Sequence, residues 1–231
     1  MADILTVPGA EGTCVHLRRS ARARRLSLRV GRSDGRVTLT LPVRVPMAEA
    51  RAFIAAQSDW IARHVAAVPP TRRVRVGMML PLMGREVQVV AGGGRSARYV
   101  DGTVAVPDDA RAGPRVRALF RSLAQARLAE AVDRHARVLG QSPARLALRD
   151  PRSRWGSCSS RGDLMFSWRL VMAPPEVLDY VAAHEVAHLA HMDHSARFWA
   201  QVEALMPDYA PCRAWLRAHG AALHAVDFGA P

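Results

Sequence analysis

The sequence contains no lysine, so all 33 of its basic residues are arginines, and they outnumber the 20 acidic residues. The formal net charge of +13 is uneven: residues 1–100 hold 17 arginines and 6 acidic residues, and residues 101–231 hold 16 and 14. The densest group is Arg18, Arg19, Arg22, Arg24 and Arg25. Such a field favours anionic partners, among them nucleic acid, nucleotides and acidic protein tails. A solvated surface encoded by a GC-rich genome explains the same arginines, and both interpretations stay open.

Cysteine is scarce, and its three copies lie far apart at Cys14, Cys158 and Cys212 without a CxxC pair. This spacing argues against a disulfide framework and against a cysteine-rich zinc module. Long apolar runs are missing too. None approaches the roughly 20 residues of a membrane span, and the N-terminus carries charges where a signal peptide has its apolar core. We therefore expect a cytoplasmic protein that makes no contact with a membrane.

The N-terminal part of the chain has the alternating pattern of β-strands, interrupted by one helical stretch. The strand-like runs are residues 26–30, 37–41, 74–90 and 99–106. Turn formers around Gly35 separate the first two runs, which is typical of a β-hairpin. Apolar residues at helical spacing predict a helix over residues 47–68. Residues 1–107 are therefore predicted to form a basic, β-rich module.

Beyond a composition shift near residue 107, helical spacing dominates. A long amphipathic helix is predicted over residues 114–139, with Gly140 as its C-terminal signal. The other predicted elements are strands at 145–150 and 163–171 and helices at 176–190, 196–206 and 212–224. Residues 108–231 thus form a second predicted domain, and the whole chain has the pattern of an α+β protein. A chain of this length buries a core without a structural metal, so a bound metal would serve catalysis.

Residues 184–188 read His-Glu-Val-Ala-His, an HExxH motif, within the helix predicted at 176–190. Two histidines four positions apart lie on one face of a helix, about 6 Å apart along its axis, so both imidazoles can reach one zinc ion. Glu185 between them can then act as general base on a water molecule. The alternative is a pair of helix-face histidines whose rings bind backbone groups or water.

A catalytic zinc takes a third protein ligand and keeps one position open. His191 shares the helical face of His184, but it lies about 10 Å away along the axis, which is too far for one zinc ion. His194 follows turn and cap formers, so we expect the chain to fold back and carry it to the metal, with Ser195 capping the next helix. Asp193 is either an acceptor for an imidazole N–H or a capping residue.

A Gly/Ser-rich turn at residues 156–162 precedes the second C-terminal strand. Trp155, Gly156 and Ser157 can present backbone groups to a substrate that lies alongside as an additional strand. The alternative is that Trp155 is a core aromatic residue and Gly156 a turn residue. Cys158 suggests a thiol nucleophile near histidines, but the metal motif already uses those histidines.

Several motifs in fixed order resemble one protein family. They are Asp-Tyr-Val-Ala-Ala-His-Glu-Val-Ala-His-Leu at 179–189, Asp-His-Ser-Ala-Arg-Phe-Trp at 193–199, Pro-Asp-Tyr at 207–209, Arg-Trp-Gly-Ser-Cys-Ser at 154–159, Trp-Arg-Leu at 168–170 and, more loosely, Asp-Trp-Ile at 59–61. Together they are similar to the YgjP-like branch of the SprT-like zinc metallopeptidases. The resemblance implies a zincin-like catalytic domain with an HExxH active-site helix and His194 as third ligand. Departures at Phe166, Ser167 and Val186 do not touch the metal.

These features predict a zinc-dependent metallohydrolase with one zinc ion per chain, and a peptide bond of a peptide or protein as its substrate. His184, His188 and His194 would hold the metal, and Glu185 would be the catalytic base. Two alternatives use the same site. One is a zinc-dependent phosphohydrolase acting on nucleotides, which the arginines would suit. The other is a nucleic-acid-associated protease of the SprT type.

Overall fold

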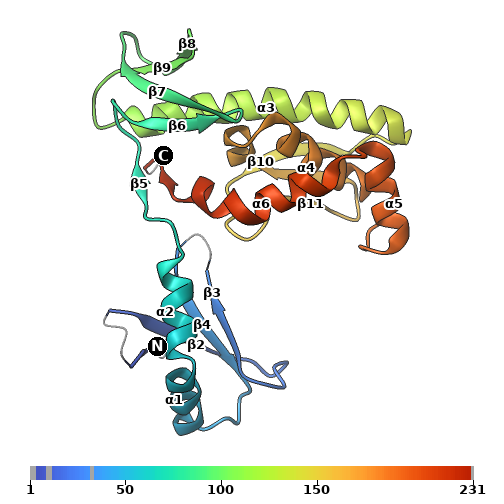
Figure 1. Cartoon of the computed structure of the whole chain (residues 1–231). Helices are drawn as coiled ribbons and strands as arrows, with labels where there is room; N and C mark the ends of the chain where they lie inside the picture. Colours follow the sequence, from blue (N-terminus) through green and yellow to red (C-terminus); the bar gives the residue numbers. More distant parts are fainter. Residues whose placement is uncertain (1–3, 9–11, 32–33, 230–231) are drawn as a thin grey trace. The chain divides into compact units, whose positions relative to one another are not determined.

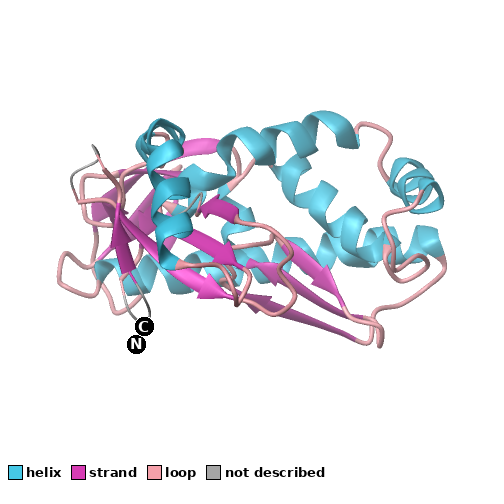
Figure 2. Ribbon diagram, turned by 90° about the horizontal axis from the view of Figure 1, so that it is seen from below, coloured by secondary structure: helices cyan, strands magenta, loops and turns pink. Residues whose placement is uncertain are grey.

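The computed structural model describes residues 4–8, 12–31 and 34–229, and the chain divides into two compact units, Met1–Pro70 and Thr71–Pro231. Both units combine helices with strands (Figure 1, Figure 2), so the chain is α+β as predicted. Within the described ranges, no helix has both the length and the apolar character of a membrane span. The boundary predicted near residue 107 falls inside the second unit, because the strands before it share a core with the helix after it.

The first unit is a four-stranded sheet packed against two helices. Its elements are β1 (Ile4–Thr6), β2 (Cys14–Arg19), β3 (Ser27–Val30), β4 (Val37–Leu41), α1 (Met47–Ala56) and α2 (Ser58–Ala66), and the strand order is β1-β2-β4-β3. The predicted hairpin is confirmed, since β3 and β4 pair antiparallel. The single helix predicted over 47–68 is wrong, because the chain leaves helical geometry at Gln57, where φ is −107° and ψ is 10°.

The second unit packs three small sheets around the long helix α3 (Ala112–Leu139). The strands are β5 (Arg72–Arg73), β6 (Met79–Leu82), β7 (Arg85–Ala91), β8 (Arg98–Val100), β9 (Thr103–Val106), β10 (Arg145–Arg149), β11 (Gly156–Cys158), β12 (Asp163–Ser167) and β13 (Val226–Asp227). Their orders are β6-β7-β9-β8, β10-β12-β11 and β13-β5. The remaining helices are η1 (Trp168–Met172), α4 (Pro175–Ala187), α5 (Ala196–Leu205) and α6 (Tyr209–His224). Gly140 ends α3 in the left-handed conformation with a φ of 74°, as predicted.

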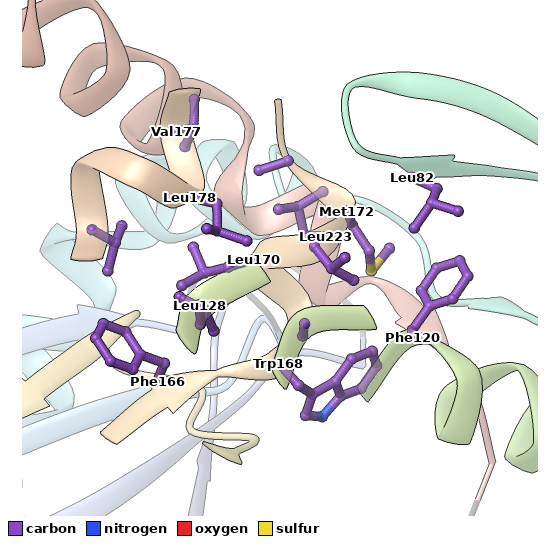
Figure 3. Packing of buried hydrophobic residues seen from close by; sticks show 14 of the residues in the cluster. Leu82, Phe120, Leu128, Phe166, Trp168, Leu170, Met172, Val177, Leu178 and Leu223 are labelled. Atoms are coloured by element: carbon purple, nitrogen blue, oxygen red, sulfur yellow. The ribbon is translucent and has the colours of Figure 1, made fainter. Parts of the chain in front are cut away.

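One hydrophobic core joins the layers of the second unit (Figure 3). Phe120 of α3, Phe166 of β12 and Trp168 of η1 are fully buried in it. Phe120 and Trp168 both pack edge-on against Phe228, with ring centroids 5.7 and 5.1 Å apart. Aromatic side chains of this kind remove roughly 150–250 Å² each from water, so they dominate the stability of the core. The core also receives one face of α4, which carries the HExxH motif.

The hairpin between β6 and β7 fixes the start of α4. Met83 at its tip has a φ of 49°, and its N–H donates to the carbonyl oxygen of Val171 at 2.7 Å. The next residue, Gly84, approaches Pro174, the N-cap of α4, so closely that a Cβ on Gly84 would lie 3.0 Å from the Pro174 Cα. A side chain at Gly84 would push the hairpin away from the helix.

The strand predicted at 163–171 is confirmed as far as Ser167 and wrong beyond it. The Ser167 hydroxyl accepts a hydrogen bond from the N–H of Arg169 at 3.4 Å and so caps the 3₁₀ helix η1. All five η1 residues are buried. A wholly buried apolar segment has no periodicity that separates a strand from a helix, which is why the sequence pattern misled here.

The side chain of Arg169, the charged residue of η1, donates four hydrogen bonds. Its guanidinium donates to both carboxylate oxygens of Asp150, at 2.7 and 3.2 Å. It also donates to the carbonyl oxygens of Leu223 and Val226, each at 2.8 Å. Because Arg169 is buried, no water is at hand to replace its bonds to the two carbonyl groups. The residue therefore ties η1 to the end of α6.

Arg169→Met should lower the free energy of unfolding by about 2–4 kcal/mol, because it leaves two buried carbonyl groups and the Asp150 carboxylate without their donor. Urea denaturation measures the change. The matched control is Arg161→Met, because the Arg161 side chain is 87% exposed and meets Asp163 only at 3.8 Å. We expect a change within about 0.5 kcal/mol there. Equal effects in the two variants would contradict the structural role of Arg169.

Candidate functional site

The HExxH residues lie at the end of α4. The predicted helix extended to residue 190, but α4 ends at Ala187, and His188 is its C-cap. The N–H groups of Ala190 and His191 both donate to the carbonyl oxygen of Ala187 at 3.1 Å, which closes a turn where the helix would have continued. The ring of His188 stabilises this turn, because its Nδ1 donates to the carbonyl oxygen of His191 at 2.9 Å.

The next residues return the chain toward α4. The carboxylate of Asp193 accepts a hydrogen bond from the N–H of Ser195 at 3.2 Å. The Ser195 hydroxyl accepts from the N–H of Phe198 at 3.5 Å, so the cap predicted at Ser195 is confirmed. Of the two roles open to Asp193, the structure supports capping, since its exposed carboxylate binds a backbone N–H.

This return brings the three predicted ligand histidines together. One ring nitrogen from each of His184, His188 and His194 lies within 4.8 Å of the others. The Nε2 atoms of His184 and His194 are 3.3 Å apart. A tetrahedral zinc ion with Zn–N bonds of about 2.05 Å places its nitrogen ligands roughly 3.3 Å apart, so this spacing suits such an ion. His191 is not part of this group of three histidines, and it contributes the backbone carbonyl oxygen that binds the ring of His188.

Phe198 packs against all three imidazoles. It is fully buried, and its ring centroid lies 4.9 Å from that of His184, 4.3 Å from that of His188 and 4.8 Å from that of His194. Trp199 adds contacts at 5.6 Å to His184 and at 6.0 Å to His194. These contacts restrict rotation of the imidazole rings and hold their donor nitrogens in place.

Burial keeps the two helix histidines in their neutral form. Burial, with smaller effects from the neighbouring imidazoles and Arg213, lowers the pKa of His184 to about 3. Burial also lowers the pKa of His188, although the hydrogen bond to His191 opposes this shift. A neutral imidazole has a lone pair for a metal, so the donor set fits a divalent cation. Three such nitrogens suit zinc, and they also suit copper, iron or nickel.

Glu185 follows His184 in α4, and its side chain is buried. Burial raises the pKa of its carboxyl group to about 8, against the lowering effect of the Arg154 charge. Gly156 of β11 lies directly against the carboxylate, because a Cβ on Gly156 would be 2.5 Å from the Glu185 Oε1. Glycine is required at this position for the carboxylate to keep its place. The backbone of one candidate substrate-binding residue thus touches the predicted general base.

The family model described as "YgjP-like, metallopeptidase domain" matches residues 24–219. This chain belongs to that family. It is also similar to a solved structure, the crystal structure of the metallopeptidase zymogen of Pyrococcus abyssi abylysin, with 21% sequence identity and a TM-score of 0.36. That match covers 40% of this chain and 92% of the other, and a similarity of this degree supports no argument about the fold. No curated protein matches the chain.

In this YgjP-like protein, Trp155 packs against the core. This is the alternative to substrate binding that the sequence left open. The Trp155 ring stacks on that of His224 in α6 with centroids 4.7 Å apart, and a Cβ on Gly220 would lie 2.9 Å from its Cζ2. Gly156 and Ser157 lie in β11 at the edge of their sheet.

Burial, together with the negative charge of Glu185, raises the pKa of Cys158, which keeps the thiol protonated and opposes a nucleophilic role.

Sequence reasoning missed a group of side chains beside His184. The Tyr180 ring lies 5.9 Å from that of His184 and 6.1 Å from that of Tyr209. Tyr209 stacks on Trp199 at 5.5 Å, and the guanidinium carbon of Arg213 lies 4.4 Å from the centroid of the Trp199 ring. Tyr180 lies four positions before His184 on the same helix, and this spacing was the signal that could have identified it.

Gly156→Ala should lower the free energy of unfolding by about 1–3 kcal/mol, because the added methyl group overlaps the Glu185 carboxylate. Urea denaturation measures the loss. Gly93→Ala is the control, since a Cβ there meets nothing within 4 Å. We expect a change below about 1 kcal/mol in either direction for the control. A Gly156→Ala protein as stable as the control would show that the two residues are not in contact.

His224 should make the stability of the second unit depend on pH. Burial, with a smaller effect from the Arg169 charge, lowers the pKa of His224 from 6.5 to about 4. The unfolded chain therefore binds more protons in this window, so stability is present above pH 6.5 and is lost as the pH falls toward about 4. Because solvent reaches part of the ring, we expect a loss on the order of 1–2 kcal/mol.

His224→Phe keeps the stacking on Trp155 and should remove this part of the pH dependence. Urea denaturation of both proteins at pH 7 and at about pH 4.5 measures the difference between them. Equal losses in the two proteins would assign the pH dependence to other groups.

Proposed function

We propose that this YgjP-like protein is a zinc-dependent metallopeptidase that hydrolyses peptide bonds. The observation that carries the proposal is the group of three imidazole nitrogens within 4.8 Å of one another, beside the buried carboxyl group of Glu185. Three protein ligands leave the fourth position of a tetrahedral ion open, which is typical of catalytic zinc sites. Membership of a metallopeptidase family supports the same reaction class.

In the proposed site, His184, His188 and His194 hold one zinc ion, and Glu185 transfers protons. Bound zinc supplies a Lewis acid that polarises water and the carbonyl group of the substrate. The Glu185 carboxylate accepts a proton from the attacking water and passes it to the leaving amine. Its contact with Gly156 limits the rotamers open to the carboxylate.

The proposed substrate lies along β11. This strand is last in the order β10-β12-β11, so among the described elements it pairs with β12 alone and has a free edge. An extended peptide can add to that edge through hydrogen bonds to the backbone of Gly156 and Ser157. Because Gly156 touches Glu185, a peptide on this edge has its backbone next to the general base.

A zinc-dependent phosphohydrolase is the second candidate, and two arginines favour it. The charge of Arg213 contributes to the low pKa of His184, and the charge of Arg154 acts on the pKa of Glu185, so both lie close to the site. Neither arginine forms an ion pair with a carboxylate of the described residues. Guanidinium groups without a carboxylate partner can bind a phosphate, which a nucleotide would provide.

Glu185→Gln should retain about one zinc ion per chain and lose turnover by a factor of about 10² to 10⁴, because the residue moves protons and does not hold the metal. Metal analysis and hydrolysis of quenched fluorescent peptides measure the two properties. Glu203→Gln, at an exposed position of α5, is the matched control and should keep both. Wild-type turnover in Glu185→Gln would refute the proposed role.

Casein-derived peptides and nucleoside triphosphates, each assayed with and without a chelator, separate the two candidates. Hydrolysis of peptides that stops with chelator and returns with zinc supports the peptidase. The same behaviour with triphosphates alone supports the phosphohydrolase. Activity that is unaffected by chelator contradicts both.

A further inference from the structure

The sheet of the first unit has one buried face and one open face. The buried residues of β4 contact α1 and α2, and they alternate with Thr38 and Thr40, which point to the opposite face. The strand register pairs Arg29 of β3 with Thr38, and Arg18 of β2 with Thr40. The two arginines therefore lie on the open face, on either side of β4.

Arg18 and Arg29 are exposed, and neither forms an ion pair with a described carboxylate. With strands about 4.8 Å apart and a rise of about 3.3 Å per residue, their Cα atoms lie about 12 Å from each other. Ser27 pairs with Thr40 and adds a third hydroxyl to this face. The strands β1, β2, β3 and β4 contain no Asp or Glu. The open face thus combines positive charge with hydrogen-bond donors.

The loop after β2 continues this charge with Arg22, Arg24 and Arg25, all exposed. Arg19, which the sequence groups with them, has a different role. Its side chain donates to the carbonyl oxygens of Val43 and Val45, at 2.7 and 2.9 Å, and so stabilises the connection between β4 and α1. The structure therefore replaces Arg19 by Arg29 as a member of the exposed basic surface.

We propose that this open face binds duplex nucleic acid through its phosphates. Guanidinium groups bind phosphate in a bidentate manner, and hydroxyl groups add further donors. The strands β2, β3 and β4 carry no Phe, Tyr or Trp, and His16, which pairs with Thr38, is the one ring that they place on this face, so the face offers a poor platform for stacking unpaired bases. Ile4 of β1, which pairs with His16 and is 52% exposed, is the one large apolar side chain that the described strands place on this face, and protein partners are bound through several such anchors. A duplex, which presents its phosphates outward, matches this surface better than a single strand or an acidic peptide. The proposal does not depend on the hydrolytic function.

Fluorescence anisotropy of a labelled DNA duplex, between about 50 and 200 mM salt, tests the proposal. The full chain carries Glu185→Gln so that turnover does not interfere. Each phosphate contact contributes a slope of about −0.9 to log K against log salt concentration. Arg18→Ser combined with Arg29→Ser should reduce the slope by about 1.8 and weaken binding at low salt by about 10- to 100-fold. Arg18→Lys with Arg29→Lys should keep most of the slope.

The matched control is Arg51→Ser combined with Arg63→Ser, which makes the same change in net charge at exposed positions of α1 and α2. This control should keep both the affinity and the slope. Equal weakening in the two double variants would show that only net charge matters and would overturn the proposal. Absence of binding, or binding without salt dependence, would also overturn it. So would tighter binding of single-stranded DNA, or of poly-glutamate, than of the duplex.

Discussion

The hydrogen bond from His188 Nδ1 to the carbonyl oxygen of His191, 2.9 Å long, controls the geometry of the site. It occupies one ring nitrogen of His188 and leaves Nε2 for a metal, and it stabilises the turn that ends α4 at Ala187. A continuing helix would carry each later residue about 1.5 Å further along the axis, away from His184. The turn returns the chain instead, and the Nε2 of His194 comes within 3.3 Å of that of His184.

Burial determines the chemical state of the same residues. The low pKa of His184 and the high pKa of Glu185 have one cause, since a charged form is costly where water is excluded. A bound divalent cation needs neutral imidazoles and favours a carboxylate over a carboxylic acid. Its charge would therefore keep the imidazoles as they are and lower the pKa of Glu185. The neutral imidazoles are therefore already suited to a cation. By lowering the pKa of Glu185, the cation would convert that residue to the carboxylate, which can act as a base.

Most of the candidate site could be predicted from the sequence, because it depends on residues that are close together in the chain. The spacing of His184 and His188 follows from the helical repeat, and the return of His194 follows from turn and cap formers such as Ser195. The family resemblance, which the match over residues 24–219 confirms, pointed to the same residues.

The contacts that sequence reasoning missed join residues far apart in the chain. Gly156 meets Glu185, and Tyr180 meets Tyr209, only because β11, α4 and α6 pack together. The boundary predicted near residue 107 falls inside the second unit for the same reason. Strands β6 to β9 share a core with α3, and β5 pairs with β13 from the other end of the chain. No local pattern records such pairings, whereas the helices α3, α4, α5 and α6 and most strands could be identified from their own periodicity.

Zinc analysis of two histidine variants tests most directly whether the turn after α4 delivers His194 to the metal. His191→Ala removes a ring but keeps the backbone carbonyl that His188 binds, so about one zinc ion per chain should remain. His194→Ala removes the third ligand, and the purified protein should lose its zinc. Full zinc content in His194→Ala, with loss in His191→Ala, would contradict the arrangement described above.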